Sequence, residues 1–189
     1  MNIVAIVQAR MNSTRLPGKV LKKLTDKSAI EILLDRLGQA EALNKVIIAT
    51  SDNPKDEELK NYLINLNFNV YSGSERDVLN RFFLAAKSVS ADVIVRISGD
   101  CPCIDPVLIN KMISTFLAND LDYCSNVITP TFPDGLDIEV FSFASLERAN
   151  AEAHSSYDRE HVTPFIKNSN LFKVHNVSNK KDFSHIRLT

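Results

Sequence analysis

The first half of the chain alternates short apolar runs with amphipathic segments. The runs predict four strands, at residues 3–7, 46–50, 68–71 and 92–97. The first, second and fourth are apolar through their centres, which is typical of strands buried on both faces of a parallel sheet. Helical spacing of apolar residues predicts helices from residue 28 to about 42, around 59–66 and around 78–86. This strand–helix–strand order requires right-handed crossovers and predicts a parallel sheet.

The second half continues this pattern less regularly. Apolar positions over residues 106–119 predict an amphipathic helix, and further helices are expected to open at Ser142 and Ser155. Segment 129–135, with its Pro, Asp and Gly, predicts an irregular loop. Short strands are expected at residues 122–126, 135–141, 172–177 and 184–188.

Two of the predicted helices begin with capping signals. Ser28 and Glu31 match a capping box, in which each side chain binds an early backbone amide of the helix. The run from Ser51 to Pro54 supplies a cap and an N-terminal proline for the next helix. These signals fix where the two helices start.

Length and charge narrow the class of protein. The 189 residues fit one α/β domain that buries a full core without disulfides or structural metal. Lys and Arg total 22 against 23 Asp and Glu, so the chain lacks the general basic surface of proteins that bind DNA or RNA. No apolar run approaches the roughly 20 residues needed to cross a bilayer. We therefore expect neither a nucleic-acid partner nor a membrane partner.

The cysteines and the chain start indicate a compartment. The three cysteines are an odd number, and Met1 and Asn2 lead straight into the first predicted strand. We therefore expect no secretory leader and a reducing cytoplasmic location. Cys101 and Cys103 lack the second ligand pair of a zinc site, which favours buried packing residues. His161, without a nucleophile or second metal ligand, is interpreted as structural.

Three cations follow the first predicted strand within ten residues, namely Arg10, Arg15 and Lys19. Ligands of open α/β sheets bind at the carboxyl edge of the strands, where this segment is expected. Arg offers phosphate planar bidentate donors while Lys offers a compact charge, so the mixture suits a polyphosphate. Charge alone leaves open a solvated basic loop. The segment is not a Walker P-loop, because Ser13 replaces the first glycine and Val20 follows Lys19.

A second polar segment, Ser98-Gly99-Asp100, follows the fourth predicted strand and is expected at the same edge of the sheet. Asp100 could hold Mg²⁺ through its carboxylate while a triphosphate completes the coordination shell. Alternatively, Asp100 caps the next helix, although Asp105 and Pro106 already supply that signal.

Residues 135–141 alternate in polarity, and Asp137 and Glu139 are expected on one face of a strand. Two carboxylates on one face could bind sugar hydroxyls or assist a metal ion. They could equally form the solvated face of an edge strand. The residues alone leave both readings open.

Four separated segments together resemble the sugar-activating cytidylyltransferases, enzymes that join a sugar acid to CMP from CTP. The segments are Gln8-Ala9-Arg10 through Leu16-Pro17-Gly18-Lys19, Ser72-Gly73-Ser74-Glu75-Arg76, Gly135-Leu136-Asp137-Ile138-Glu139-Val140-Phe141 and Asp158-Arg159-Glu160-His161-Val162-Thr163-Pro164. They are most similar to the spore-coat polysaccharide biosynthesis branch of that family. The resemblance covers nearly the whole chain.

The resemblance implies a fold and an activity. The fold is a three-layer α/β/α sandwich around a mostly parallel sheet, of the nucleotide-diphospho-sugar transferase (glycosyltransferase-A-like) type. The activity is Mg²⁺-dependent transfer of CMP from CTP to a small sugar, expected to be acidic, with release of pyrophosphate. Its product would serve surface or spore-coat polysaccharide biosynthesis.

The resemblance also assigns roles to single residues. Nucleotide binding falls to Gln8, Ala9, Arg10, Ser13, Arg15, Lys19, Ser72, Gly73, Glu75, Arg76, Ser98 and Gly99. Catalysis falls to Arg10, Arg15, Lys19 and Asp100, with Asp100 also the Mg²⁺ ligand, and sugar binding falls to Gly135, Asp137 and Glu139. In segment 72–76 a glycine lets the backbone approach a planar base, whose edge polar groups can read. The alternative for that segment is a capped helix start with surface charges.

The chain departs from the family pattern after Arg187-Leu188-Thr189. The family continues there into a Thr-x-Asp segment and a further Asp, which resemble a second metal-holding group. We therefore expect a single domain over residues 1–189 that lacks the family's C-terminal segment. Two other hypotheses stay open: a nucleotidyltransferase that uses another nucleoside triphosphate, and a nucleotide-binding protein without catalysis. A homodimer is the commonest oligomeric state.

Overall fold

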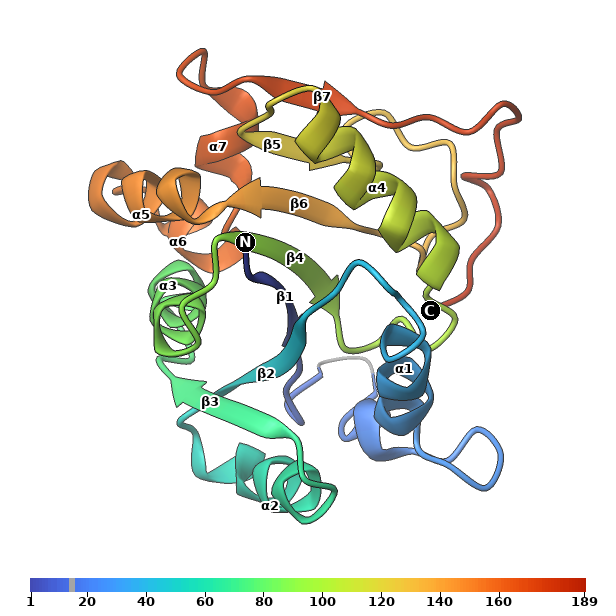
Figure 1. The fold of residues 1–189 in the computed structure, drawn as a ribbon. Helices are drawn as coiled ribbons and strands as arrows, with labels where there is room; N and C mark the ends of the chain where they lie inside the picture. The colour runs from blue at the N-terminus through green and yellow to red at the C-terminus, as the bar shows by residue number, and fades with distance from the viewer. Residues whose placement is uncertain (14–15) are drawn as a thin grey trace.

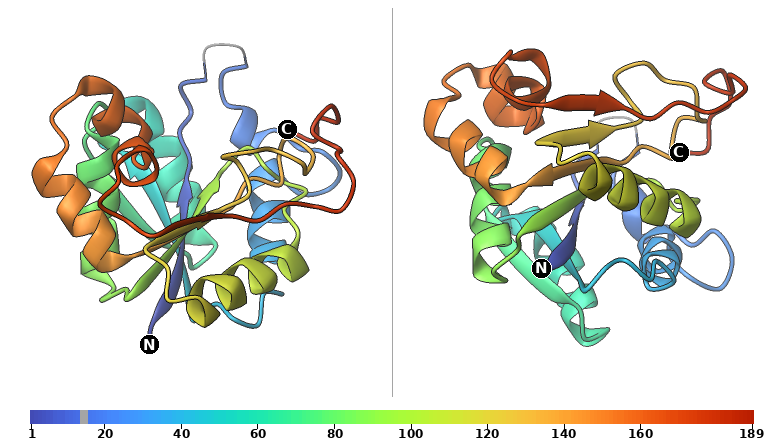
Figure 2. Two further views of the ribbon diagram at one scale, coloured as in Figure 1. Left: turned by 90° about the horizontal axis from the view of Figure 1, so that it is seen from above. Right: turned by 45° about the horizontal axis from the view of Figure 1, so that its top comes forward.

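The apolar runs of the sequence form the strands of one sheet, which helices cover on both faces (Figures 1 and 2). The computed structural model describes residues 1–13 and 16–189. The strands are β1 Ile3–Gln8, β2 Lys45–Ser51, β3 Asn69–Gly73, β4 Val93–Ser98, β5 Tyr123–Ser125, β6 Glu139–Ser142 and β7 Val174–Asn176. The α-helices are α1 Ala29–Leu37, α2 Glu57–Asn65, α3 Val78–Ser88, α4 Pro106–Ala118, α5 Phe143–Glu152, α6 Ser156–His161 and α7 Pro164–Asn168. Short 3₁₀ turns lie at η1 Lys19–Leu21 and η2 Pro54–Asp56.

The described residues form a seven-stranded sheet in the order β3-β2-β1-β4-β6-β5-β7. Strands β3, β2, β1 and β4 pair in parallel, which confirms the sheet predicted from the first half of the chain. Strand β6 runs antiparallel to both of its neighbours, β4 and β5, while β7 pairs in parallel with β5. The predicted mostly parallel α/β/α sandwich is therefore confirmed.

Strand β1 explains the continuous apolar run at the start of the sequence. Its side chains alternate between two cores, with Ala5 and Val7 facing one and Val4 and Ile6 facing the other. Buried side chains of α1, α2 and α4 complete the first core, and those of α3, α5 and α7 complete the second. Because both faces are covered, every position from Ile3 to Val7 is buried in apolar surroundings.

The capping box at the start of α1 is confirmed. The Glu31 carboxylate accepts a hydrogen bond from the backbone amide of Ser28 at 2.7 Å, and the Ser28 hydroxyl accepts one from the amide of Glu31 at 3.4 Å. The helix ends at Leu37, however, and not near Ala42 as its pattern predicts. Gly38 follows Leu37, and the turn after it returns the buried Ala40 to the core, so apolar spacing continues past the helix.

Two predicted strands are wrong in part or in whole. Only Glu139–Ser142 of segment 135–141 is a strand, because the Asn126 side chain bonds the amide of Ile138 and the carbonyl of Leu136, both at 2.8 Å. A side chain thus takes the hydrogen bonds that a strand neighbour would make. Residues 184–188 form no strand, and a single bridge between Asp134 and Arg187 joins them to the fold.

The topology brings the carboxyl ends of β1, β2, β3 and β4 to one edge of the sheet, where the amino end of β6 also lies because that strand runs the opposite way. The loops after these strands therefore meet there, as predicted. Within the described residues, no helix is both long enough and apolar enough to span a bilayer.

Candidate active site

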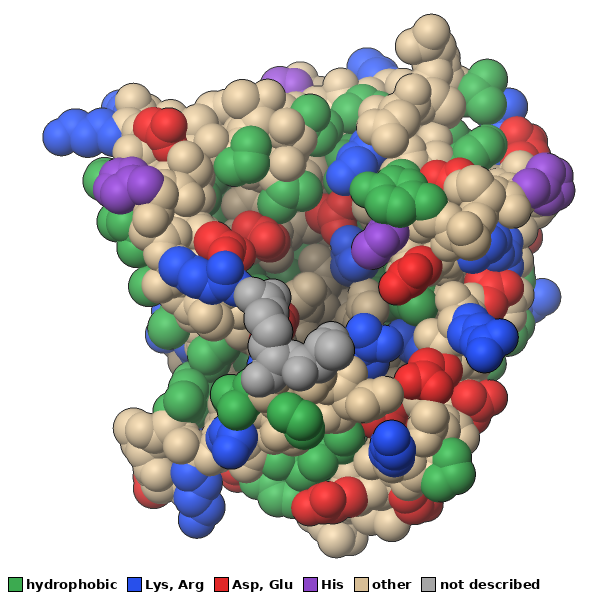
Figure 3. All heavy atoms as spheres, turned by 180° about the vertical axis from the view of Figure 1, so that it is seen from behind, with side chains coloured by type: hydrophobic (Ala, Val, Ile, Leu, Met, Phe, Trp, Pro, Cys, Tyr) green, Lys and Arg blue, Asp and Glu red, His purple; other side chains and the backbone are tan. Residues whose placement is uncertain are grey.

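Three neighbouring cavities lie along this edge of the sheet. Their volumes are about 690, 250 and 190 Å³, and we call them the nucleoside, tail and acceptor cavities after the roles proposed below. Gln8 and Arg10 line both the nucleoside and the tail cavity, and Arg96 and His161 line both the nucleoside and the acceptor cavity. Ser98 lines both the tail and the acceptor cavity. Figure 3 shows charged side chains of both signs around a hollow on this face.

The tail cavity contains the cation-rich loop and the predicted metal ligand. Ala9, Arg10, Ser13, Lys19, Ser98 and Asp100 line it, and Lys19 forms an ion pair with Asp100. The spatial convergence predicted from the sequence is therefore confirmed for these residues. The fourth predicted catalytic residue, Arg15, lies outside the described residues, so its role stays a prediction.

Gly99 permits the chain after β4 to approach the end of β1 closely, beside residues that line the tail cavity. Its amide donates a hydrogen bond to the carbonyl of Gln8 at 2.8 Å. A Cβ at this position would lie 2.7 Å from the Cβ of Ala9 and 2.9 Å from that carbonyl oxygen, closer than side chains pack. The two backbone segments can therefore lie this close only because residue 99 has no side chain.

The donor set of the tail cavity fits a hard divalent cation that shares its shell with phosphate. Asp100 offers one carboxylate, and among the described residues the hydrogen-bond partner of its Oδ1 is the weak Cys101 thiol at 3.9 Å. Among residues 1–13 and 16–189, no group of three or more Asp, Glu, His or Cys side chains is arranged to hold a metal. Mg²⁺ is commonly held by one or two carboxylates together with substrate phosphates. The cavity thus suits an ion that arrives with a polyphosphate.

A buried carboxylate anchors the cation-rich loop. Asp56 is only 2% exposed and accepts a hydrogen bond from the backbone amide of Met11 at 2.6 Å and another from the hydroxyl of Ser51. Its bonds thereby tie the exit of β1 to the end of β2. Asp56 is not predicted as a loop anchor from the sequence, because an acid near a helix start is typical of a cap. Asp56 makes no capping bond to α2.

Segment 72–76 reaches the nucleoside cavity through Glu75 and Arg76 only. Asn53 donates to the Glu75 carboxylate at 2.7 Å, and this bond, with the nearby Arg10 charge, holds the pKa of Glu75 below its ordinary value. Ser72 and Gly73 belong to β3 and line none of the three cavities. Their predicted role in nucleotide binding stays a prediction.

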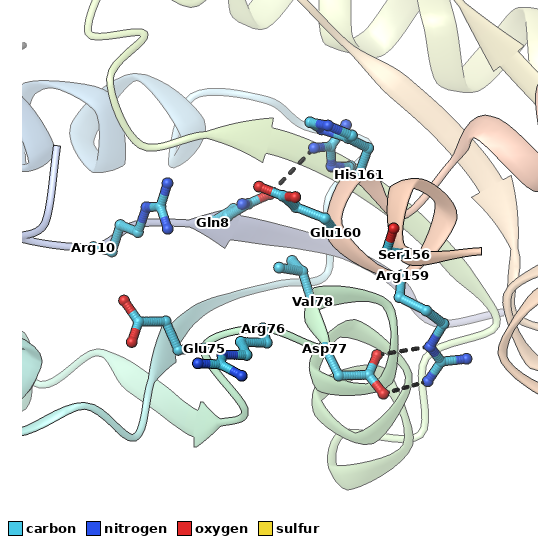
Figure 4. Close-up of a pocket in the computed structure, with 11 residues that line it drawn as sticks. Gln8, Arg10, Glu75, Arg76, Asp77, Val78, Ser156, Arg159, Glu160 and His161 are labelled. Carbon is cyan, nitrogen blue, oxygen red and sulfur yellow. Dashed lines mark hydrogen bonds and ion pairs between the residues drawn. The ribbon is translucent and has the colours of Figure 1, made fainter. Parts of the chain in front are cut away.

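Helix α6 forms the opposite wall of the nucleoside cavity (Figure 4). Arg159 donates two hydrogen bonds to Asp77, at 2.9 and 2.6 Å, and two more to the carbonyl and side chain of Asn150. Asp77 also caps α3 through the amide of Asn80. The Arg159–Asp77 pair therefore fastens α6 to the start of α3. The capping role was readable from sequence, whereas the pair joins residues 82 positions apart.

The acceptor cavity is built around a buried ion pair. Glu139 is 5% exposed, pairs with Arg96, and accepts hydrogen bonds from the hydroxyls of Tyr123 and Thr163. Burial opposes ionisation of Glu139, but the Arg96 charge and these hydrogen bonds outweigh it, so its pKa lies below the ordinary value. The solvated edge-strand alternative for Glu139 is therefore wrong, because β6 lies between β4 and β5.

Strained backbone adjoins this ion pair. Val162 has φ 72° and ψ −56°, and the amide of Thr163 donates to the carbonyl of His161 at 2.9 Å, which makes a γ-turn. A β-branched residue with positive φ is a genuine outlier. The turn aims the Thr163 hydroxyl at Glu139, 2.6 Å away. His161 is exposed and lines two cavities, so the prediction of a structural role does not match its position.

The structure also locates two predicted sugar-binding residues, Gly135 and Asp137, and two predicted packing residues, Cys101 and Cys103. Asp137 lines the acceptor cavity, whereas Gly135 does not and instead lies against Leu188. Cys101 is buried as predicted, and burial raises the pKa of its thiol. Cys103 is exposed, so the prediction of a buried packing residue is wrong for it, since it sits in the turn before α4.

Asp137 has an unusual environment for an acid at the surface. Its side chain reaches water, yet it stands in a recess whose walls remove part of its hydration and whose other carboxylates, Asp134, Glu139 and Asp100, repel its charge. Burial and this repulsion raise the pKa of Asp137 to about 6. The folded protein therefore disfavours the ionised form of Asp137 relative to the unfolded chain.

Replacement of Asp137 by Asn is expected to raise the melting temperature above about pH 6. The unfolded chain releases this proton near the ordinary value of 3.8 and the folded chain near 6, so native stability falls as pH rises between the two. Asn removes the charge that causes this loss. Thermal unfolding of both proteins at about pH 4 and pH 7.5 measures the effect. A gain of the same size at both pH values would contradict the environment described for Asp137.

Comparison with known proteins identifies the family to which the chain belongs. A family model described as cytidylyltransferase matches residues 4–187. An uncharacterized protein of Methanocaldococcus jannaschii is 47% identical over 177 residues, covering 92% of this chain and 71% of that protein. Spore coat polysaccharide biosynthesis protein SpsF of Bacillus subtilis is 37% identical over 171 residues, covering 88% of this chain and 70% of that protein.

A solved structure is similar over the whole chain. The structure of a cytidylyltransferase from Leptospira borgpetersenii superposes with a TM-score of 0.95 at 33% identity, covering 100% of this chain and 81% of that one. The similarity therefore extends through the sheet, the helices and the loops that line the three cavities.

Proposed function

The chain belongs to the cytidylyltransferase family, and we propose that it transfers CMP from CTP to a hydroxyl group of a small sugar with release of pyrophosphate. The observation that carries this proposal is the meeting of Arg10, Lys19 and Asp100 in one cavity that opens beside a larger one. Cations of two geometries beside a single carboxylate suit a triphosphate that brings a metal ion. The larger cavity has room for a nucleoside.

In this proposal the nucleoside occupies the cavity lined by Glu75 and Arg76, and the phosphates extend into the tail cavity. Arg10 lines both and would meet the phosphate nearest the nucleoside. Lys19 would neutralise charge that develops on the β- and γ-phosphates as pyrophosphate leaves. Positioned cations are the main catalytic resource of enzymes that transfer phosphoryl groups. Arg15 is proposed to share this role from the same loop.

Asp100 is proposed to hold Mg²⁺ or a similar divalent ion together with phosphate oxygens. When bound, such an ion stabilises charge on the phosphates and orients the α-phosphorus. Asp100 forms an ion pair with Lys19 in the structure. The nucleotide is proposed to separate this pair, with Lys19 moving to phosphate and Asp100 to the metal.

The acceptor sugar is proposed to bind in the acceptor cavity beside Asp137, next to Ser98 at the end of the tail cavity. Lys167 and His161 line the same cavity, and a lysine there supports an acceptor that carries a negative charge. A sugar acid meets that description. The name of the Bacillus subtilis relative supports a place in polysaccharide biosynthesis.

Lys19→Ala is expected to weaken CTP binding by about ten- to a hundredfold and to leave CMP binding within about twofold. The lysine faces the tail cavity, so its loss affects the phosphates that CMP lacks. Calorimetric titration with both nucleotides measures the effect, and Lys19→Arg, which keeps the charge, is the matched variant. Equal losses for CTP and CMP would refute the placement of the triphosphate.

The function itself is tested by a pyrophosphate-release screen. CTP, UTP, GTP and dTTP are each supplied with Mg²⁺ and a panel of acidic, amino and neutral sugars. We expect release with CTP and one or more acidic sugars. Pyrophosphate release with another nucleotide, and not with CTP, would make that nucleotide the substrate. CTP binding without pyrophosphate release in the presence of any sugar would favour a nucleotide-binding protein without catalysis.

A further inference from the structure

A chain of hydrogen bonds crosses the sheet beneath the junction of the three cavities. Glu139 on β6 pairs with Arg96 on β4, and the second Arg96 nitrogen, Nη2, donates to Oε1 of Gln8 on β1 at 3.1 Å. Arg96 and Glu139 are direct partners in the ladder, and Gln8 is the partner of Ser98, two residues further along β4. Three neighbouring strands therefore hold these side chains in fixed register.

This chain fixes which way the Gln8 amide faces. An arginine has only donors, so the atom that Gln8 turns towards Arg96 must be its carbonyl oxygen. The Gln8 amide nitrogen, Nε2, then points away from Arg96. In the part of the chain that the structure describes, this nitrogen has no hydrogen-bond partner. Gln8 thus presents two oriented N–H groups that residues 1–13 and 16–189 leave without an acceptor.

The position of Gln8 decides what those N–H groups can meet. Together with Arg10, Gln8 lines both the nucleoside and the tail cavity, so a nucleotide spanning them passes Gln8 where the nucleoside joins its first phosphate. The acceptor cavity also reaches this junction, through Arg96 and Ser98. The reacting phosphorus of a nucleotidyl transfer belongs at the point where nucleoside, phosphates and acceptor meet.

We propose that Gln8 is a catalytic residue that donates a hydrogen bond from Nε2 to a non-bridging oxygen of the α-phosphate, with Arg96 and Glu139 as its positioning residues. This inference rests on the proposed function. In the step, the sugar oxygen bonds to the α-phosphorus, and the bond from that phosphorus to the α–β bridging oxygen breaks. Pyrophosphate leaves with the electron pair, and the hydroxyl proton passes to solvent. Gln8 keeps its protons and stabilises charge on the phosphoryl oxygens.

The alternative is that Gln8 serves only to hold Arg96. Two variants separate these roles. Gln8→Met keeps the length of the side chain but has no donor, and Gln8→Glu keeps the contact with Arg96 but replaces the N–H groups with a negative oxygen. If Gln8 acts only on Arg96 and lies away from the α-phosphate, Gln8→Glu should leave nucleotide binding unchanged, because the carboxylate strengthens the contact with Arg96 and repels no phosphate.

The experiment compares cytidine, CMP and CTP by calorimetry, and follows pyrophosphate release with an acceptor identified by the screen. Gln8→Met is expected to lose about tenfold in CMP affinity and about ten- to a hundredfold in turnover, with cytidine affinity unchanged. Gln8→Glu is expected to lose more of both, since its charge repels the phosphate. In an Arg96→Met background, Gln8→Met should add little further loss, because the amide is no longer held. Melting temperatures establish that each variant is folded.

Wild-type affinity and turnover in the Gln8 variants would overturn this inference, as would equal losses for cytidine and CMP. A wild-type protein that binds neither CMP nor CTP would overturn the proposed function instead. The two failures are therefore distinguishable. Lys19→Ala, which should weaken CTP binding but leave CMP binding nearly unchanged, reports on the β- and γ-phosphates at the other end of the nucleotide.

Discussion

Asp100→Asn is expected to slow pyrophosphate release from CTP by about three orders of magnitude. A metal ion at the phosphates contributes several kcal/mol to stabilisation of the transition state, and Asp100 is the carboxylate that the tail cavity offers to such an ion. Asn keeps the shape of the side chain but binds a divalent cation weakly. Initial rates over a series of Mg²⁺ concentrations measure the loss, and raising the Mg²⁺ concentration should recover only part of it.

The substitution Asp100→Asn should change the stability of the fold very little. The Lys19 and Asp100 side chains are 30% and 32% exposed, and an ion pair of that kind contributes about 0–1 kcal/mol to stability. Asp35→Asn is the matched control, because it breaks an exposed pair with Lys27 that lies outside all three cavities. The control should keep its rate. A rate in Asp100→Asn within about threefold of the control would rule out the metal role.

Glu139→Leu is expected to lower the free energy of unfolding by about 3–5 kcal/mol, because it leaves the Arg96 charge without its buried partner. It also leaves the hydroxyls of Tyr123 and Thr163 without an acceptor. For a chain of this size the melting temperature should fall by about 6–20 °C. Denaturant unfolding and calorimetry measure the two quantities.

A double-mutant cycle shows whether the loss comes from the unpaired charge. Arg96→Met with Glu139→Leu removes both charges, so the pair of substitutions should be less destabilising than the sum of the single ones by at least about 1 kcal/mol. Additive effects would mean that Glu139 acts through its packing alone. The single Arg96→Met variant completes the cycle.

The same carboxylate gives the wild-type protein a sensitivity to acid. The pKa of Glu139 is lower in the folded chain than its ordinary value of 4.5, so the stabilisation is fully present above that value. It is lost as pH falls through the lower, folded value. The stability difference between wild type and Glu139→Leu should therefore shrink below about pH 4.

The central part of the fold was readable from local sequence because local rules decide it. Continuous apolar runs mark β1, β2 and β4, since helices cover these strands on both faces. The capping box of Ser28 and Glu31 sets the start of α1 with atoms three residues apart. Once these elements are known, the topology of parallel sheets brings Lys19 and Asp100 together.

Long-range pairing decides the features that sequence reasoning missed. Asp56 bonds the amide of Met11, 45 positions away, and no local signal distinguishes that acid from a cap. Glu139 was expected on a strand face but not beside Arg96, because its neighbours depend on the reversed direction of β6. Segment 184–188 has strand-like residues, yet within the described residues it pairs only through an isolated bridge from Arg187 to Asp134, which lies in a loop.

A crystal structure with CTP and Mn²⁺ tests the central claim most directly, because the anomalous signal locates the metal independently of the nucleotide. We expect the triphosphate in the tail cavity, with the metal bound both to the Asp100 carboxylate and to phosphate oxygens. Lys19 should have left Asp100 for the phosphates. A nucleotide bound outside the nucleoside and tail cavities, or a metal that makes no bond to Asp100, would contradict the account.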